Sequence, residues 1–280
     1  MMALFLILDA GSGAGRSLVV NERGEVLSSA YREWSYQFEA EVDGASAFDA
    51  PTFWETLLST AEEALRQAKV KAGEILAVAV TSLREGVVFI DAEGRELYSG
   101  SQFDERARQE GEALARERGD QIYFTCGTYP PTYGYAARLR WFATHRPQAY
   151  QRIAAVLTMG DWIFWKLCGE LRSEPSLASS SGLFDIRQRD WSWELVDSLG
   201  VPRSWLPPLY RAGCEPVPLR DEVAERLGLS STTLVTLAGG DTQCAMLGMG
   251  LYQPGQAGCV AGSTSPIQYL TGKPLFDADK

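Results

Sequence analysis

The stretch LFLILDAGSGAGRSLVVNERGE, residues 4–25, contains the features that decide the start of the fold. The apolar run at 3–8 predicts a strand buried on both faces, because it offers no polar side to solvent. A glycine-rich turn follows at 9–16, then a short strand at 17–20 and a turn at 21–24 that predicts an antiparallel hairpin. The chain therefore leaves its glycine-rich turn along a strand, whereas a Walker or dinucleotide-binding loop opens into a helix.

The turn at 9–16 carries groups that suit a phosphate and a metal ion. Gly11, Gly13 and Gly15 allow the backbone to approach a phosphate closely, and Ser12 adds a hydroxyl donor. Asp9 ends the predicted strand and is placed to hold hydrated magnesium, which keeps its waters and takes few protein ligands. The simpler interpretation is a glycine-rich hairpin turn without a ligand.

The rest of the chain alternates predicted helices and strands, which is typical of the α/β class. Strands are predicted at 75–80, with 86–90 as its neighbour, at 234–237, and as a hairpin at 256–261 and 266–270. Helices are predicted at 53–69, 105–118 (exposed), 135–144, 161–167 (capped by Gly160 or Asp161), 219–227 and after 241. The segment SEPSLASSSG at 173–182 is too polar for a core and predicts a surface or cleft loop.

Composition limits the partners of the chain. Its 280 residues are 45% hydrophobic and 22% charged, which fits one large folded domain or two modest ones. The net charge of -10 argues against nucleic acid and anionic lipid, so an anionic ligand needs backbone amides, a helix N-terminus or a metal ion. No signal peptide and no apolar run of the ~20 residues that span a bilayer is present, which predicts a cytoplasmic protein without a membrane partner.

Cysteine and histidine usage narrows the chemistry further. The five cysteines are scattered, without a C-x-x-C pair, and predict reduced, buried thiols. The single histidine, His145, excludes multi-histidine metal sites and nearly excludes a Ser-His-Asp triad. His145 itself ends a predicted helix, and a local hydrogen bond is its simplest role.

Glycine-bearing or acid-bearing turns follow predicted strands at 9–16, 81–86, 238–241 and 261–265, which indicates one cleft lined by strand ends. Asp241 follows two glycines and precedes a helix, so its carboxylate is suited to accept a proton from a substrate hydroxyl. The alternative for Asp241 is a helix N-cap. Arg84 with Glu85, and Asp104 with Arg106, suit a polyhydroxy ligand, and their alternative is solvated surface charge.

Taken in order, these motifs resemble the FGGY carbohydrate kinases, which have the actin/sugar kinase/heat-shock ATPase fold, a ribonuclease H-like α/β domain with a mixed sheet flanked by helices. The turn from Asp9 to Arg16 resembles the family's first phosphate turn. Gly239-Gly240-Asp241 resembles the turn with the catalytic base, and 262–264 stands at the second phosphate hairpin. Residues 138–145 resemble the first family signature, with Arg138 in place of lysine. The resemblance covers residues 4–270.

The resemblance implies ATP-dependent phosphorylation of a hydroxyl on a small polyhydroxy substrate. It gives Asp241 the role of general base and Asp9 that of organising Mg²⁺. The implied ATP phosphate contacts are Gly11, Ser12, Arg16, Gly262, Ser263 and Thr264. The implied substrate contacts are Arg84, Glu85, Gln102, Asp104 and Tyr133.

Within the family, segments 82–88, 103–107, 161–171 and 181–191 resemble the autoinducer-2 kinases. Glycerol kinases share the Arg-Glu pair, whereas xylulose kinases carry a Gln-Met-His type of segment there, which argues against xylulose. Family members are about twice as long, with ATP between two domains. We therefore expect 1–248 to be the N-terminal domain and 249–280 the first hairpin of a truncated ATP-binding domain, inactive alone as a kinase.

Other functions stay open from the sequence. A non-catalytic sugar-binding or sensor protein on the same fold is the main alternative, although Asp9, Ser12 and Asp241 together argue against it. A nicotinamide-dependent oxidoreductase is disfavoured, because the first glycine turn opens into a strand. A second copy of the chain, as a homodimer, is a further candidate partner.

Overall fold

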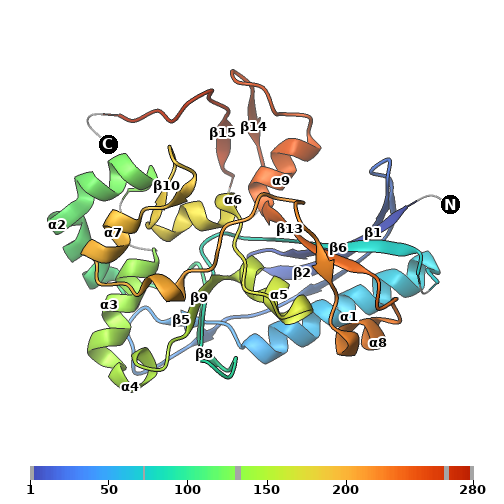
Figure 1. The fold of residues 1–280 in the computed structure, drawn as a ribbon, viewed down its shortest axis with the longest axis horizontal. Coiled ribbons are helices and arrows are strands. Elements are labelled where there is room, and N and C mark those ends of the chain that lie inside the picture. Colours follow the sequence, from blue (N-terminus) through green and yellow to red (C-terminus); the bar gives the residue numbers. More distant parts are fainter. Residues whose placement is uncertain (1–2, 72, 130–133, 262–264, 278–280) are drawn as a thin grey trace.

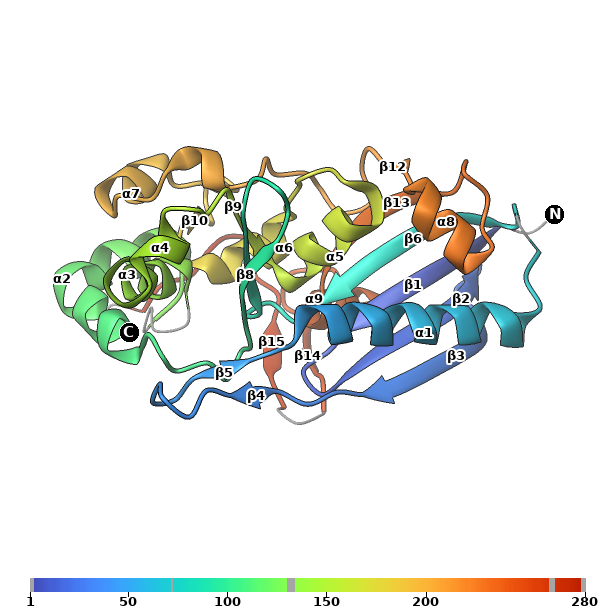
Figure 2. The same cartoon turned by 90° about the horizontal axis from the view of Figure 1, so that it is seen from below.

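The computed structural model (Figure 1) describes residues 3–71, 73–129, 134–261 and 265–277. Its largest sheet has the strand order β12-β13-β6-β1-β2-β3, which can be followed in Figure 2. β6 lies between β1 and β13 and is parallel to both, whereas β12 pairs with β13, β2 with β1 and β3 with β2, all antiparallel. The strands of this first sheet are β1 (Leu4–Ala10), β2 (Ala14–Asn21), β3 (Val26–Glu33), β6 (Ile75–Ser82), β12 (Val217–Pro218) and β13 (Leu234–Gly240).

One face of the first sheet carries the core. α1 (Ala50–Ala68) runs along β1, β2 and β3 (Figure 2), and α5 (Met159–Cys168) packs on β6 and β13. In β1, Leu6, Leu8 and Ala10 are buried in this core, whereas the alternate side chains, Ile7 and Asp9 among them, are only half-buried. The expectation of burial on both faces is therefore wrong for β1, and its pleat directs Asp9 away from the core.

α1 begins three residues before the predicted start because its cap lies outside the apolar pattern. Asp49 is the N-cap, and its carboxylate accepts a hydrogen bond from the Thr52 backbone N–H at 3.1 Å. Pro51 stands in the first turn, where its missing N–H costs no helix hydrogen bond. Lys69 ends the helix with a left-handed backbone at φ 55°.

A second, antiparallel sheet has the order β4-β5-β8-β7-β9. The prediction that 86–90 neighbours 75–80 is wrong, because β6 already has β1 and β13 on its two edges. The chain leaves the first sheet after β6 and enters the second. Its strands are β4 (Gln37–Phe38), β5 (Ser46–Ala47), β7 (Val87–Ile90), β8 (Glu96–Gly100) and β9 (Ala155–Thr158).

A second core joins this sheet to a group of helices. α2 runs on to Cys126, beyond the predicted end, through a kink at Arg118, and it buries Leu114 and Ile122. The predicted exposed helix is therefore only partly exposed. The helices of this part are α2 (Arg108–Cys126), α3 (Tyr135–His145), α4 (Pro147–Tyr150) and α7 (Trp193–Ser198), with the 3₁₀ turn η2 (Arg203–Trp205).

The serine-rich segment lines a cavity, as the prediction of a cleft position has it, but it is not a loop. It forms α6 (Pro175–Ala178) and the 3₁₀ turn η1 (Ser179–Ser181), and Ser173, Leu177 and Ser181 are buried. Its hydroxyls find partners inside the protein, so their polarity does not force the segment to the surface.

The cap of α5 also differs from the prediction of Gly160 or Asp161. Thr158 is the N-cap, and Asp161 completes a capping box with it.

The remaining elements complete the chain. The predicted hairpin near the end is confirmed, and Figure 1 shows it standing beside α9, above the first sheet. These elements are β10 (Phe184–Asp185), β11 (Asp190–Trp191), α8 (Asp221–Leu227), α9 (Asp241–Gly248), β14 (Ala257–Cys259) and β15 (Ile267–Tyr269).

Candidate active site

Three parallel strands of the first sheet end side by side. In the strand register, Asp9 of β1 is opposite Thr81 of β6, and Thr81 is opposite Gly239 of β13. Neighbouring strands lie about 4.8 Å apart, so these three positions form a short row at the carboxyl edge of the sheet. α9 begins directly after Gly240, and Asp241 is its first residue. Open α/β sheets bind ligands at this edge.

The negative charge of Asp241 acts on Asp9 at this edge. Burial, and then the negative charge of Asp241, raise the pKa of Asp9 to about 6, and Arg16 partly opposes the rise. Burial also raises the pKa of Asp241, whereas hydrogen bonds from Thr242 and the charge of Arg84 lower it. Neither carboxylate forms a salt bridge within the described part of the chain.

The N-cap interpretation of Asp241 is wrong. Gly240 occupies the cap position of α9, and no side-chain cap hydrogen bond forms there. Asp241 Oδ1 instead accepts hydrogen bonds from the adjacent Thr242, from its N–H at 2.6 Å and its hydroxyl at 3.1 Å. The Asp241 carboxylate therefore does not cap the N-terminus of α9.

The loop after β6 brings Arg84 and Glu85 to the same place. Their side chains form a loose ion pair at 3.7 Å and are about one-third exposed. Both charges act on the pKa of Asp241, Arg84 lowering it and Glu85 raising it. Arg84 also packs so closely on Gly240 that a Cβ there would meet its Cγ at 3.0 Å. The two residues are thus held beside Asp241 rather than free in solvent.

The first glycine-rich turn closes on itself and on Tyr36. The Gly11 N–H donates to Ala14 O at 3.0 Å, and the Tyr36 hydroxyl donates to Ser12 O at 2.5 Å. Arg16 is opposite Asp9 in the hairpin register and is exposed. The turn is a β-hairpin, as predicted, and its Ser12 side chain forms no hydrogen bond within the described residues.

Gln102 is tied to the same turn through Tyr36. The Tyr36 hydroxyl lies 3.2 Å from Gln102 Oε1 as well as contacting Ser12 O. Gln102 Nε2 is buried and lacks a hydrogen-bond partner within the described residues. A buried amide donor without a partner is unfavourable, so this atom is suited to a ligand oxygen.

A cavity of about 570 Å³ opens beside this cluster. Arg84 and Glu85 line it on one side, and Ser179 and Ser180 of the serine-rich segment on another. Its volume falls within the range typical of small-molecule sites. Ser180 was not identified from the sequence, yet its hydroxyl lies 2.9 Å from Arg84 O. The sequence feature that could have indicated Ser180 is the run of serines on either side of Leu177 and Ala178.

Arg138 connects two loops of the cluster. It is fully buried, and it donates to Glu85 O at 3.0 Å and to Ser101 O at 2.8 Å. Glu85 directly follows Arg84 in the sequence, and Ser101 directly precedes Gln102. The sequence marked Arg138 only as a departure from a family signature, and its role in joining the two loops depends on tertiary structure.

Asp104 has a different environment from the other predicted substrate residues. Its side chain is 0% exposed, with Arg106 Nε at 2.7 Å and the Tyr98 hydroxyl bonded to Oδ2. Oδ1 accepts the Ser46 N–H at 3.1 Å. The carboxylate is therefore enclosed by protein partners, and direct contact with a substrate is not available to it in this arrangement. The correction follows from burial, which the polar sequence around Asp104 did not indicate.

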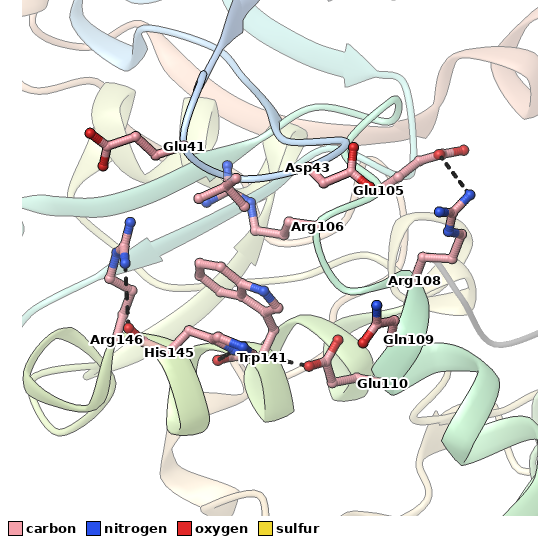
Figure 3. Close-up of a pocket in the computed structure, with 11 residues that line it drawn as sticks. Glu41, Asp43, Glu105, Arg106, Arg108, Gln109, Glu110, Trp141, His145 and Arg146 are labelled. Atoms are coloured by element: carbon pink, nitrogen blue, oxygen red, sulfur yellow. Dashed lines mark hydrogen bonds and ion pairs between the residues drawn. The ribbon is translucent and has the colours of Figure 1, made fainter.

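His145 belongs to another pocket, of about 330 Å³, which Arg106 also lines. Figure 3 shows Arg106, Trp141 and His145 gathered there. The His145 ring stacks on Trp141 at 4.8 Å, and Nδ1 lies 3.0 Å from Trp141 O. This matches the predicted local role, and none of the cluster at the sheet edge lines this pocket.

Tyr133, Gly262, Ser263 and Thr264 lie outside the described residues. Within the described residues, no group of three or more His, Cys, Asp or Glu side chains is arranged to hold a metal ion. No described helix has the length and apolar character needed to cross a membrane. All five cysteines are free thiols, as predicted, but Cys214 and Cys259 are exposed rather than buried.

Comparison with solved structures gives the fold. The gluconate kinase of Lactobacillus acidophilus superposes with a TM-score of 0.90 at 18% identity, over 100% of this chain and 56% of that one. The glycerol kinase of Plasmodium falciparum, solved with ADP, gives 0.84 at 20% identity, over 95% and 54%. The predicted α/β fold class, a mixed sheet flanked by helices, is confirmed by these matches and by the observed sheets.

Comparison with curated proteins gives the relatives. The autoinducer-2 kinase of Klebsiella pneumoniae is 33% identical over 269 residues, which is 94% of this chain and 50% of that protein. The autoinducer-2 kinase of Salmonella typhimurium is 30% identical over 92% and 49%. The chain thus spans about half the length of the curated relatives it matches. A family model, the N-terminal domain of the FGGY family of carbohydrate kinases, matches residues 4–248. The chain therefore belongs to the FGGY family of carbohydrate kinases.

Proposed function

We propose that the protein containing this chain uses ATP to phosphorylate a hydroxyl of a small polyhydroxy compound, with Asp241 as general base. The observation that carries the proposal is the position of Asp241. It lies at the carboxyl edge of three parallel strands, within the field of Asp9, Arg84 and Glu85. Membership of the FGGY carbohydrate kinase family supports ATP-dependent phosphorylation in general.

Asp241 suits proton abstraction from a hydroxyl. The carboxylate forms no salt bridge within the described residues, and burial raises its pKa above the usual value for aspartate, which makes it a stronger base. It would accept the proton of the attacking hydroxyl as the new O–P bond forms and the bond from the γ-phosphorus to the leaving ADP oxygen breaks. Phosphoryl transfer depends mainly on positioning and charge stabilisation, so one well-placed base suffices.

Arg84 and Glu85 are proposed to bind the substrate. They line the cavity of about 570 Å³, and they present a cationic donor and an anionic acceptor beside Asp241. Hydroxyl groups donate and accept hydrogen bonds, so such a pair can fix the orientation of a polyol. Gln102 Nε2 supplies a further donor, and Tyr133 stays a prediction.

Magnesium fits Asp9 and Asp241. Both carboxylates lie at one sheet edge without a salt bridge in the described part of the chain, and the charge of Asp241 raises the pKa of Asp9. Mg²⁺ prefers oxygen ligands and is usually held by one or two carboxylates, waters and substrate phosphates. Asp9, with Asp241 nearby, would hold the hydrated ion, which when bound supplies charge neutralisation for the phosphates of ATP.

The phosphates themselves are proposed to meet the first glycine-rich turn. Gly11, which has no side chain, lets the backbone come close to a phosphate, Ser12 provides a hydroxyl donor, and Arg16 stands opposite Asp9 on the next strand. Gly262, Ser263 and Thr264 are proposed as the second set of phosphate contacts. The proposed division of the chain follows from this, with substrate groups in 1–248 and the start of an ATP-binding domain in 249–280.

The autoinducer-2 kinases among the relatives support an autoinducer-2-like substrate, and other sugars or polyols are the alternatives. The decisive experiment is a panel of sugars, polyols and the autoinducer precursor, tested with ATP and Mg²⁺ on the full-length protein. We expect phosphorylation of one member, and none by the Asp241→Asn variant. A compound that binds by calorimetry without ATP, and is never phosphorylated, would instead identify a sensor protein.

Three further proposals concern the whole protein. We expect the 280-residue chain alone to have negligible kinase activity, because its curated relatives are twice as long. Full activity of this chain would contradict the proposed place of the nucleotide. A homodimer is tested by light scattering of the purified protein, and cytoplasmic location by fractionation of the source cells.

A further inference from the structure

The peptide group that joins Gly239 to Gly240 is held at both ends. Its carbonyl oxygen, on Gly239, accepts a hydrogen bond from Thr81 Oγ1 at 2.8 Å. Its N–H, on Gly240, donates to Ser176 Oγ at 2.8 Å. Asp241 is the next residue along the chain. The orientation of this one peptide plane therefore sets the direction in which α9 and the Asp241 carboxylate leave β13.

Glu174 holds Ser176 in turn. Because Ser176 Oγ accepts from Gly240, its single hydroxyl proton is left to donate, and it bonds to Glu174 Oε2. The same oxygen accepts the backbone N–H of Ser176 at 2.8 Å and of Leu177 at 3.3 Å. Glu174 is only 6% exposed, and none of the salt bridges in the described residues includes it. Its carboxylate is thus committed to α6 and, through Ser176, to the strand end.

Gly239 allows this close approach. Its φ of +113° is in the region that favours glycine, and a Cβ there would lie 2.7 Å from Ser176 Oγ and 2.9 Å from Glu174 Oε2. The strand register shifts between Leu237 and Gly239, so the backbone bulges just before the held peptide. Bulges near active sites re-aim a side chain, and here the re-aimed residue is Asp241.

A structural role for α6 alone does not require this arrangement. Glu174 is the N-cap of α6, and a cap needs only to accept the two backbone N–H groups. The Ser176 hydroxyl goes further, since it reaches a backbone N–H 64 residues away in the sequence. Burial raises the pKa of Glu174, whereas hydrogen bonds from Ser176 lower it, in keeping with an enclosed acceptor.

We propose that Ser176, held by Glu174, and Thr81 are positioning residues for Asp241: together they fix the Gly239–Gly240 peptide and so aim the base at the substrate hydroxyl. This inference rests on the proposed function, because it takes Asp241 as the base. It gives the serine-rich segment a second task beside lining the cavity. None of the three residues is expected to touch the substrate.

The test compares Ser176→Ala and Glu174→Gln with wild type in the full-length protein. We expect kcat to fall about tenfold or more, while KM for the sugar and for ATP stays within about twofold, since misaimed groups lose rate rather than ground-state binding. Ser176→Thr keeps the hydroxyl and is expected to recover most of the lost kcat. Hydrogen–deuterium exchange of peptides covering 236–246 is expected to increase in Ser176→Ala, because the Gly240 N–H loses its acceptor.

The matched control is Ser59→Ala. The Ser59 hydroxyl donates to Thr56 O at 3.0 Å within α1, so the variant loses one comparable hydrogen bond away from the site. It should change neither kcat nor exchange at 236–246. An unchanged kcat in Ser176→Ala, with Asp241→Asn inactive, would overturn this inference alone. Full activity in Asp241→Asn would overturn the proposed base, and the inference with it.

Discussion

The two halves of the molecule bury aspartates in opposite ways. At the edge of the first sheet, Asp9 and Asp241 have no salt bridge within the described residues, and burial raises the pKa of both. In the second half, Asp104 is bonded to Arg106 and Tyr98 and is closed to solvent. A half-buried carboxylate without a cation partner is costly, so two of them at one sheet edge indicate a ligand or chemistry there.

Asp91 sharpens the contrast. It lies in the turn between β7 and β8, where burial opposes its ionisation. Hydrogen bonds from the Arg95 backbone and from the Arg152 and Arg95 side chains outweigh this and hold its pKa well below the ordinary value. The same residue type thus ionises more readily in one half of the protein and less readily in the other. Partners decide the direction, and burial is common to both.

The largest expected effect is on the paired side. Arg106→Leu leaves the Asp104 carboxylate buried without its cation, and we expect the free energy of unfolding to fall by about 3–5 kcal/mol. Urea unfolding followed by circular dichroism measures this. A loss smaller than about 1 kcal/mol would mean that the Asp104–Arg106 pair is no stronger than a surface salt bridge. The contrast between paired and unpaired aspartates would then be wrong.

On the unpaired side, Asp241→Asn tests chemistry. In the full-length protein we expect kcat to fall at least ~100-fold, because the amide cannot accept the hydroxyl proton. Asp91→Asn serves as control, since it removes a carboxylate of the second half and should leave kcat within about twofold. Steady-state kinetics with ATP measures both. Equal kcat in Asp241→Asn and wild type would exclude Asp241 as the base.

Asp9→Asn is expected to raise the stability of the protein at high pH, whereas Arg106→Leu lowers it. The folded protein keeps the Asp9 proton up to about pH 6, whereas the unfolded chain releases it near 3.8, so this group lowers stability as pH rises between those values. We expect Asp9→Asn to be more stable than wild type at pH 8, by at most about 3 kcal/mol, and equal to it below pH 4. Urea midpoints at the two pH values measure this. Lower stability at pH 8 would contradict the raised pKa.

The smallest expected effect is a difference in stability loss between two aspartates that lie at helix N-termini, Asp49 and Asp241. Asp49 caps α1, so Asp49→Ala is expected to lower the free energy of unfolding by about 1 kcal/mol. Asp241 forms no cap hydrogen bond in α9, so Asp241→Ala should show no such loss. Thermal unfolding of the two variants provides the comparison, and equal losses would restore the cap interpretation of Asp241.

Much of the site was predictable because its signals are local. A strand that ends in Asp9 before a glycine turn, and another that ends in two glycines before Asp241, are readable within ten residues. The α/β class and the late hairpin followed from the same kind of pattern, and both are observed. The predicted roles of these residues in binding ATP and substrate remain predictions.

Other features could not be read locally. The burial of Asp104 depends on Tyr98, Arg106 and Ser46 converging on it, and the neighbours of β6 depend on which strand edges are already occupied. The serine-rich segment looked too polar for a core, and the burial of Ser173 and Ser181 is explained only by their hydrogen-bond partners in the folded chain, Asp161 and the Leu183 N–H.

By itself, the sequence determined which residues end strands and turn the chain, because backbone preferences act within a few residues. Which of these strand ends lie next to one another was decided only by the tertiary structure. Thr81 and Gly239 are 158 residues apart and share a hydrogen bond, and Ser176 reaches Gly240 from a third segment. Such pairings depend on sheet register and on the packing of α1 and α5 against the sheet, which no local pattern encodes.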